Sequence, residues 1–390
     1  MRVLISAGEA SGEMYGAGLI EALQRLAASR GLGSIEFFGL GGDRMRKAGC
    51  ETVIEARDVA VVGIFEVVSH LPSIYRRFHK LVREAEQRRP DLAVLIDFPD
   101  FNFRLAKELH RLGIPVIYYV SPQLWAWRSR RVELVKKYVR KMLVIFPFEE
   151  QWYRERGVTA EFVGHPLAGT EAAGDAAAES SQIALLPGSR RKEIRFNLPL
   201  MLDVAESLAP SYKFVLPVAS TVDDTFLYSI VRRHWSCENP TSKITLCRDV
   251  RIALTQSRAA VVASGTATVE AAVIGTPFVM VYRMAPLSYA LGTKMVNVPF
   301  YAMPNLIAGR QVVPELVQEN YIAEKVVAEL SAILPDGPQR EGMLEGLGEV
   351  RRRLRGSDPG NSNAFERAAA AVLNAVNGTL RSRASTNGSA

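Results

Sequence analysis

The chain has 390 residues, 48% of them hydrophobic and 23% charged, which is typical of a globular protein and leaves room for two domains with separate cores. The three cysteines, Cys50, Cys237 and Cys247, lack metal-ligand spacing, so we expect a reducing compartment and no metal site. No apolar run reaches the ~20 residues that span a membrane, and we expect no secretory signal at the N-terminus. The formal net charge of +7 favours an anionic partner, either a nucleic acid, an anionic lipid or a phosphorylated substrate.

The first half of the chain opens with a strand, a glycine-containing turn and a helix. Apolar residues predict a strand over 2–7, residues 8–13 form the turn, and helical periodicity follows. This opening is Rossmann-like, but it lacks a complete G-x-G-x-x-G, and Glu9 and Glu13 would repel a pyrophosphate. We therefore interpret the turn, which also contains Ser11, as a loop that faces a sugar or an acceptor.

Residues 59–78 allow two interpretations. The stretch is almost wholly apolar up to Val68 and then has apolar residues at helical spacing beside Arg76, Arg77 and Lys80. A buried helix pair is the usual meaning of such a run, and the residues alone favour it. The alternative is an amphipathic element that enters a bilayer surface while its basic residues meet anionic headgroups. Its membrane-contacting residues would be Val62, Ile64, Phe65, Val67 and Val68.

Two predicted strands of the first half lead into residues that are candidates for catalysis or binding. A buried strand over 91–96 ends in Asp97, and an acid at the carboxyl end of a parallel strand points into the crevice where α/β proteins bind ligands. A strand over 115–120 leads into a Trp-Ala-Trp sequence that starts at Trp125, whose indoles are either core anchors or the wall of a pocket. His165 follows a later strand, and a single histidine at such a place is more often structural than catalytic.

After a linker over 168–181 that is rich in small residues, the second half opens in the same way as the first. An apolar strand over 183–186 is broken by a Pro-Gly pair that ends at Gly188, and we expect Ser189 to cap the helix that follows. The N–H groups of such a helix start attract an anion, and Arg190 adds positive charge. A solvated basic helix start would explain the same residues, but the place of this unit at the start of a second repeat favours the anion site.

A second turn with glycine and hydroxyl residues follows the strand predicted over 259–263. Ser264, Gly265 and Thr266 enter a helix start, and Glu270 lies one and a half turns later, where a carboxylate could hold a ribose diol. Helix capping by Ser264 and Thr266 explains part of this pattern without a ligand. Alternation of helices with further strands indicates a doubly wound parallel sheet. These strands are predicted over 213–218, 243–246 and 276–282.

The last part of the chain has the weakest pattern. Proline, asparagine and glycine over 297–317 predict a loop, and loops at sheet edges carry function. Helices are predicted over 322–334, 340–354 and 362–376. The tail over 378–390 is polar and rich in small residues, so we expect it to be disordered.

Seven motifs occur in an order that resembles lipid-A-disaccharide synthase, a bacterial glycosyltransferase family with the GT-B fold. The resemblance extends from about Arg2 to Glu319. It implies an α/β protein with two Rossmann-like, doubly wound parallel-sheet domains that face each other across a cleft. Glu13 departs slightly from the family, which usually has Asp there. The motifs are residues 7–12, 97–102, 119–128, 164–167, 186–190, 263–267 and 304–310.

The resemblance also implies how the chain divides. An N-terminal acceptor-binding and membrane-facing domain would cover 1–167, and a C-terminal helix over 355–377 would pack back on it. The domain that binds the UDP-sugar would cover 182–354. The family reaction joins UDP-2,3-diacylglucosamine to 2,3-diacylglucosamine 1-phosphate through a β-1,6 linkage in lipid A and lipopolysaccharide synthesis, with release of UDP and inversion at the anomeric carbon.

Inversion by direct attack needs a single base. The resemblance assigns this role to Asp97, with His165 as the rival, and implies neither a cofactor nor a metal because basic residues can neutralise the departing diphosphate. The implied donor-binding residues are Gly188, Ser189, Arg190, Ser264, Gly265, Thr266, Glu270, Asn305, Arg310 and Gln318. The implied residues on the acceptor side are Glu9, Ser11, Glu13 and Trp125.

Acylated substrates raise the weight of the membrane interpretation of residues 59–78. They imply a peripheral enzyme on the cytoplasmic face of the inner membrane, with no nucleic-acid partner and with the choice between monomer and homodimer left open. Two other functions compete. Another GT-B enzyme that uses UDP-N-acetylglucosamine, either a transferase or a 2-epimerase, would share the anion sites but not the loop at Trp125 or residues 304–310. A non-catalytic nucleotide- or RNA-binding protein would need a continuous basic stripe with exposed aromatic residues, whereas the basic residues here are scattered.

Overall fold

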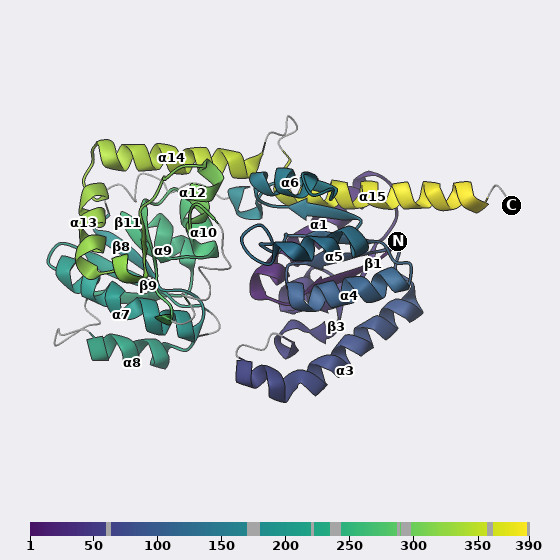
Figure 1. Cartoon of the computed structure of the whole chain (residues 1–390), viewed down its shortest axis with the longest axis horizontal. Helices are drawn as coiled ribbons and strands as arrows, with labels where there is room; N and C mark the ends of the chain where they lie inside the picture. Colours follow the sequence, from purple (N-terminus) through teal and green to yellow (C-terminus); the bar gives the residue numbers. More distant parts are fainter. Residues whose placement is uncertain are drawn as a thin grey trace. The chain divides into compact units, whose positions relative to one another are not determined.

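The computed structural model divides the chain into two compact α/β units (Figure 1). Unit 1 comprises Met1–Pro166 and Arg355–Ala390, and unit 2 comprises Leu167–Leu354. The C-terminal segment therefore belongs to the same unit as the N-terminus. The structure describes residues 1–59, 64–169, 180–219, 222–234, 243–286, 289, 298–356 and 362–387, with the backbone alone for Ala10, 64–71 and 377–387.

Unit 1 is built on a seven-stranded parallel sheet with the strand order β3-β2-β1-β4-β5-β6-β7. The chain proceeds outward from β1 in one direction and outward from β4 in the other, so the order reverses between these two neighbours. In open α/β sheets, ligands bind at this switch point, beyond the carboxyl ends of the strands. The strands are β1 (Arg2–Ala7), β2 (Glu36–Gly41), β3 (Cys50–Glu55), β4 (Leu92–Ile96), β5 (Val116–Tyr119), β6 (Lys141–Val144) and β7 (Ala160–Phe162).

Helices alternate with the strands of unit 1. The five residues of β4 are all apolar and buried, as expected of a parallel strand that is covered on both faces. By contrast, the sequence pattern missed β3, because Glu51 and Glu55 interrupt its apolar residues at the sheet edge. The helices are α1 (Ala10–Ser29), α2 (Asp43–Lys47), α3 (Ile64–Arg88), α4 (Pro99–Arg111), α5 (Val132–Tyr138), α6 (Pro147–Arg154) and α15 (Ala364–Asn387).

The last helix, α15, packs against α1. Arg367 of α15 donates from Nε to the carbonyl of Val163 at 2.8 Å, which ties the helix to the end of β7. The helix continues to Asn387, so the disorder predicted from residue 378 was wrong for the described part of the tail. Residues 377–387 contain no proline, and helical hydrogen bonding therefore extends from the packed part without a break.

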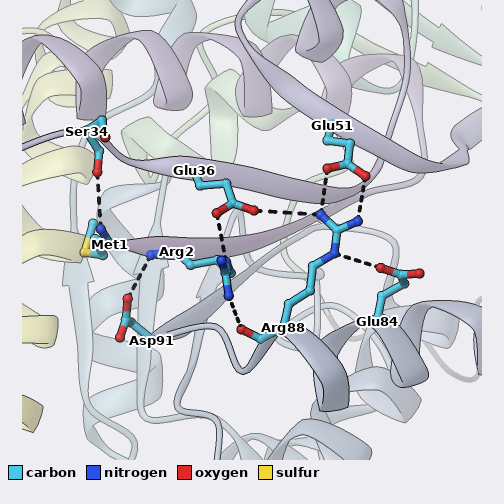
Figure 2. A network of polar contacts seen from close by, with 8 residues as sticks. All are labelled: Met1, Arg2, Ser34, Glu36, Glu51, Glu84, Arg88 and Asp91. Atoms are coloured by element: carbon cyan, nitrogen blue, oxygen red, sulfur yellow. Dashed lines mark hydrogen bonds and ion pairs between the residues drawn. The ribbon is translucent and has the colours of Figure 1, made fainter.

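Arg88, at the end of α3, anchors this helix to the amino edge of the sheet (Figure 2). Its Nη1 and Nη2 donate to the Glu51 carboxylate at 2.6 and 2.7 Å, and its Nε donates to Glu84 at 2.8 Å. Arg2 donates from Nε to Glu36 at 2.9 Å and from Nη1 to the Arg88 carbonyl at 2.5 Å. Arg2, Glu36 and Glu51 lie at the starts of β1, β2 and β3, and the ligand-binding switch point lies at the opposite, carboxyl edge of the sheet, so the network supports the fold rather than the site.

Unit 2 is built on a six-stranded parallel sheet with the order β10-β9-β8-β11-β12-β13. Its switch point lies between β8 and β11, the two strands that precede the glycine turns found in the sequence. The strands are β8 (Gln182–Leu186), β9 (Lys213–Pro217), β10 (Ile244–Cys247), β11 (Ala259–Ala263), β12 (Phe278–Tyr282) and β13 (Glu315–Val317). The helices are α7 (Arg191–Leu208), α8 (Asp224–His234), α9 (Val250–Thr255), α10 (Thr266–Ile274), α12 (Met303–Ala308), α13 (Ala323–Ile333) and α14 (Pro338–Arg355).

The loop predicted over 297–317 was wrong for its described residues, which contain α12 and β13. Pro304 lies in the first turn of α12, where a missing N–H costs no helical hydrogen bond. Gly309 ends the helix in the left-handed conformation, with φ 71°. Proline and glycine therefore mark the two ends of a short helix here, while Asn297 lies outside the described residues.

Candidate active site

The switch point of unit 1 brings Glu9 and Asp97 together. Glu9 follows β1 as the N-cap of α1, and Asp97 follows the neighbouring strand β4. The negative charge of Glu9 is close enough to raise the pKa of Asp97. Gly8 lies so near the Phe98 ring that an added Cβ would stand 2.3 Å from Phe98 Cδ1. The two turns therefore form one surface at the carboxyl edge of the sheet.

The backbone of Asp97 is held in a left-handed conformation, with φ 46°, which few residues other than glycine, asparagine and aspartate adopt. Two donors hold its carbonyl, Asn102 Nδ2 at 2.8 Å and Tyr118 Oη at 2.6 Å. Asn102 is fixed in turn by Ser6, whose Oγ donates to Asn102 Oδ1 at 2.7 Å. Backbone strain that is held by surrounding contacts is concentrated at functional sites. This clamp positions the Asp97 carboxyl.

The two predicted bases differ in proton affinity. Burial, and then the charge of Glu9, raise the pKa of Asp97 to about 6, although the Phe98 N–H donates to the carboxylate and opposes the shift. His165 is buried, and burial lowers its pKa to about 3. Since a general base works best with a pKa near the working pH, this geometry favours Asp97 over His165.

Trp125 donates a hydrogen bond to a buried acid, Glu149, that the sequence analysis did not single out. Glu149 is fully buried in the first turn of α6, accepts from Trp125 Nε1 at 3.0 Å, and accepts from the Phe146 N–H at 3.1 Å. Burial raises the pKa of Glu149 to about 8. The Trp125 ring also packs edge-on against Phe148, with centroids 4.9 Å apart. The loop after β5 is therefore anchored to α6, and Trp125 is half-buried.

The other two predicted residues on the acceptor side lie on α1. Glu13 accepts from the Arg44 N–H at 2.6 Å, so its carboxylate caps the start of α2. This contact gives Glu13 a structural function in addition to any contact with a ligand. Ser11 is half-buried in the first turn of α1, beside the Glu9 turn.

The membrane prediction falls largely outside the described side chains. Val62 lies outside the described residues, and only the backbone is described for Ile64, Phe65, Val67 and Val68, which belong to α3. From Ile64 onward the stretch is one helix with Pro72 inside it, rather than a helix pair. Within the described chain, no helix combines the length and the apolar character that crossing a bilayer would require.

The turn after β8 in unit 2 is covered by a side chain of its own helix. Glu193 Oε2 accepts from the N–H groups of Ser189 and Arg190 at 3.2 and 3.3 Å, and Arg190 Nη1 donates to Glu193 Oε1 at 2.9 Å. The N-cap of α7 is Arg190, so the prediction that Ser189 caps this helix was wrong. Gly188 has φ 114°, and a Cβ on it would lie 2.7 Å from Glu193 Oε2. A carboxylate of the chain itself therefore occupies the anion-binding amides predicted here.

The helix start after β11 is open by comparison. Gly265 is the N-cap of α10 with φ 141°, and no described side chain caps it. Thr266 is exposed, and Ser264 Oγ donates to the Tyr301 carbonyl at 3.2 Å, so neither residue caps the helix as one interpretation of the sequence expected. Burial raises the pKa of Glu270, while nearby Arg251 opposes this shift. The amides of α10 are the better-exposed anion site at this switch point.

The remaining predicted donor residues have structural contacts. Asn305 is fully buried; its Oδ1 accepts from the N–H groups of Val312 and Val313 at 2.7 and 2.9 Å, and its Nδ2 donates to the Val313 carbonyl and to Glu315. In this structure Asn305 therefore holds the end of α12 and does not present its amide to a ligand.

The side chains of Gln318 and Arg310 also contact other residues of unit 2. Gln318 pairs with the backbone of Met284, accepting from its N–H at 2.8 Å and donating to its carbonyl at 3.2 Å. Arg310 Nη2 donates to Glu349 of α14 at 2.7 Å. No described contact brings Arg310 to the turns at Gly188 or Gly265.

Sequence reasoning missed four side chains that hold the site in place, namely Asn102, Tyr118, Glu149 and the half-buried Glu193. The two glutamates did leave a signal, since each is an acid at the third position of a helix, where its carboxylate can reach the amide of the N-cap. Asn102 ends the motif 97–102, but the motif does not say that its amide holds the Asp97 carbonyl, and no local pattern points to Tyr118, which lies 21 positions from Asp97 on another strand.

Comparison with known proteins decides the family. A model of the lipid-A-disaccharide synthetase family matches residues 3–356. A lipid-A-disaccharide synthase of Koribacter versatilis is 56% identical over 383 residues, which cover 96% of this chain and 98% of the relative. The chain belongs to the lipid-A-disaccharide synthase family. A member from Acidobacterium capsulatum is 49% identical, with 92% of this chain and 93% of the relative covered. A lipid-A-disaccharide synthase family member is a glycosyltransferase of lipid A biosynthesis, which decides against a non-catalytic nucleotide- or RNA-binding protein.

Solved structures of other proteins agree with the fold of this lipid-A-disaccharide synthase family member. The S. aureus MnaA–UDP co-structure matches with a TM-score of 0.62 and 11% identity, over 97% of each chain. The calicheamicin glycosyltransferase CalG4 matches with a TM-score of 0.56 and 18% identity, over 91% of this chain and 96% of the other. At these identities the likeness shows the GT-B fold alone, with two α/β units that each contain a parallel sheet.

Proposed function

We propose that this enzyme transfers the sugar of UDP-2,3-diacylglucosamine to the 6-hydroxyl of 2,3-diacylglucosamine 1-phosphate, with inversion and release of UDP. The bond from the anomeric carbon to the diphosphate oxygen breaks, and its electrons leave with UDP. The acceptor oxygen forms the new β-1,6 bond and loses its proton. This balance requires one base for the proton and a cationic site for the departing diphosphate.

Asp97 is the main support for the proposal. Its carboxyl has a pKa of about 6, so it is mostly ionised at neutral pH and still basic enough to take a proton. Its position follows from the clamp on its backbone by Asn102 and Tyr118. In this proposal, Glu9 raises the basicity of Asp97 through like charge, and Trp125 forms a wall on the acceptor side.

The diphosphate is assigned to unit 2. The open N-terminus of α10 offers amides that need no displacement of a side chain, and Arg190 lies on the neighbouring turn after β8. Glu270, half-buried one and a half turns into α10, is assigned to the ribose. Arg190 must exchange its contact with Glu193 for the phosphate, because the same guanidinium cannot serve both carboxylate and ligand fully.

Acylated substrates place the enzyme at a membrane surface, in this proposal the cytoplasmic face of the inner membrane. The apolar residues of 62–68 would provide the contact. Changing both Ile64 and Phe65 to Ser is expected to move the protein from the membrane fraction to the supernatant while the circular dichroism spectrum stays that of a folded protein. If the double variant unfolds instead, these residues belong to the core.

The decisive experiment measures UDP release from the diacylated donor, with and without the phosphorylated acceptor, and identifies the product by mass spectrometry and NMR. We expect acceptor-dependent UDP release and a β-1,6-linked disaccharide. UDP-N-acetylglucosamine is the matched donor that lacks the acyl chains. Faster turnover of that donor, or formation of its 2-epimer, would contradict the proposal in favour of the other GT-B enzymes considered from the sequence.

A further inference from the structure

A turn with three arginines follows the tryptophan loop of unit 1, and neither the base nor the donor site uses it. The turn comprises residues 128–131, of which Arg128, Arg130 and Arg131 carry guanidinium groups. Arg131 Nη2 lies 2.7 Å from Asp100 Oδ1, and Arg128 Nη1 lies 3.6 Å from the same atom. Asp100 is in the first turn of α4, three residues after Asp97. The arginine turn is therefore tied to the segment that positions the proposed base.

The arginine turn is held in one conformation by its own backbone and by Trp127. Arg128 has a left-handed backbone, with φ 57°, and its carbonyl accepts from the Arg131 N–H at 2.9 Å. Its guanidinium lies over the Trp127 ring, 4.3 Å from the centroid. Trp127 is 40% exposed, so the stacked pair reaches solvent. An ordinary solvated turn needs neither the unfavourable backbone of Arg128 nor two guanidinium groups on one carboxylate.

The charges at the turn leave an excess of positive charge. Arg128 and Arg131 lie beside the carboxylate of Asp100, and Arg130 adds a third positive charge to the turn, so the three arginines and Asp100 together carry a net charge of +2. A phosphate monoester carries about −1.5 to −2 at pH 7. Guanidinium groups bind phosphate oxygens in pairs, with a planar fork that lysine lacks. The cluster therefore suits a phosphate monoester both in its net charge and in the type of hydrogen-bond donor that it offers.

We propose that the arginine turn at 128–131 binds the phosphate of the acceptor sugar and so selects the phosphorylated acceptor. This inference rests on the proposed function and names the part of unit 1 that recognises one substrate. Asp97 serves the hydroxyl at one end of the acceptor ring, and Arg128 and Arg131 bind the phosphate at the other. Asp100 joins the two groups through a single helix start. Release of Arg131 from Asp100 to the phosphate would exchange an exposed ion pair for a doubly charged ligand.

The test compares two acceptors, 2,3-diacylglucosamine with and without its 1-phosphate, under the same detergent conditions. The double variant Arg128→Gln/Arg131→Gln removes the two tethered cations, and Arg111→Gln, at the far end of α4, is the matched control. Hydrogen bonds to charged groups support a loss on the order of tenfold per arginine. We expect kcat/KM for the phosphorylated acceptor to fall about 100-fold in the double variant, mostly through KM, with little change for the unphosphorylated acceptor. The Kd for UDP and the activity of the control should stay unchanged.

The variant Arg131→Lys keeps the positive charge but removes the planar guanidinium, so it should retain part of the preference for the phosphorylated acceptor. It tests the proposal even if the double variant is unstable. Equal losses with both acceptors, or an unchanged preference, would overturn the assignment. So would a double variant that keeps its preference but no longer sediments with vesicles that contain an anionic phospholipid, because the turn would then bind lipid headgroups. If the unmodified enzyme transfers to neither acceptor, the proposed function itself fails. If it prefers the phosphorylated acceptor and the variants do not alter that preference, only the site is wrong.

Discussion

Replacement of Asp97 by Asn should lower turnover and raise stability at the same time. Asparagine has nearly the same shape and also adopts the left-handed backbone found at this position, so the clamp from Asn102 and Tyr118 is retained. The change removes only the ionisable group. General-base catalysis is worth roughly 10²–10⁴ in rate, and kcat of the variant should fall by that factor while the Kd for UDP stays constant.

The effect on stability follows from the raised pKa of Asp97. The folded protein holds this proton more tightly than the unfolded chain does, so stability falls as the pH rises from about 4 to about 6. One pKa unit corresponds to about 1.4 kcal/mol, and a pKa near 6 in place of one near 4 therefore costs about 3 kcal/mol once the group is ionised. Asparagine avoids this cost. The variant should exceed the parent in stability by about 1 kcal/mol at pH 4.5 and by about 3 kcal/mol at pH 7.5.

Two measurements check this prediction. Urea unfolding at the two pH values, followed by circular dichroism, gives the stability difference, with Glu108→Gln, a half-buried carboxylate of α4 that pairs with Arg111, as the control. The pH profile of kcat/KM should rise with unit slope below about pH 6 and level off above it. If His165 were the base, its pKa of about 3 would leave that profile flat across this range. A variant with near-normal turnover, or one that is no more stable at pH 7.5, would refute the reasoning.

Three further variants test other contacts of the structure. Gly188→Ala places a Cβ 2.7 Å from Glu193 Oε2 on a backbone with φ 114°. The Kd for UDP should therefore rise, and calorimetry should show unit 2 destabilised by more than about 1 kcal/mol. An unchanged Kd would remove this turn from the donor site. Asn305→Ala removes several hydrogen bonds within unit 2, each worth about 1 kcal/mol or more, so the melting temperature of unit 2 should fall. Isothermal titration should find a smaller effect on UDP binding than on stability. A larger effect on UDP binding than on stability would give Asn305 a direct ligand contact. Glu149→Ala removes the carboxylate to which the Trp125 indole N–H and the Phe146 N–H donate, so stability should fall by about 2 kcal/mol or more. In steady-state assays, KM for the acceptor sugar should rise. A rise confined to KM for the UDP-sugar donor would contradict the position given to Trp125.

The sequence by itself determined the plan of the fold. Continuous apolar runs such as 92–96 predict strands whose two faces are both buried. Such strands alternate with glycine turns and helices along the chain, and this repeating unit indicates a parallel sheet covered by helices. The same local chemistry marked Asp97, Gly188 and Gly265 as residues at the carboxyl ends of central strands, because strand ends and turns are set by residues that are near one another in the chain. Local information also predicted a helix for 362–376, but it could not show that this helix extends to Asn387.

The tertiary structure alone decided what these residues touch. The pKa of Asp97 depends on burial and on Glu9, which is 88 positions away, and its backbone depends on Tyr118, 21 positions away. The family resemblance implied that Asn305 binds the donor, yet its side-chain amide forms hydrogen bonds with Val312 and Glu315 of the same unit. The tie between Arg131 and Asp100 likewise joins segments 31 positions apart. Proton affinity, backbone strain and the use of a polar group depend on neighbours brought together by packing, and no local pattern encodes that neighbourhood.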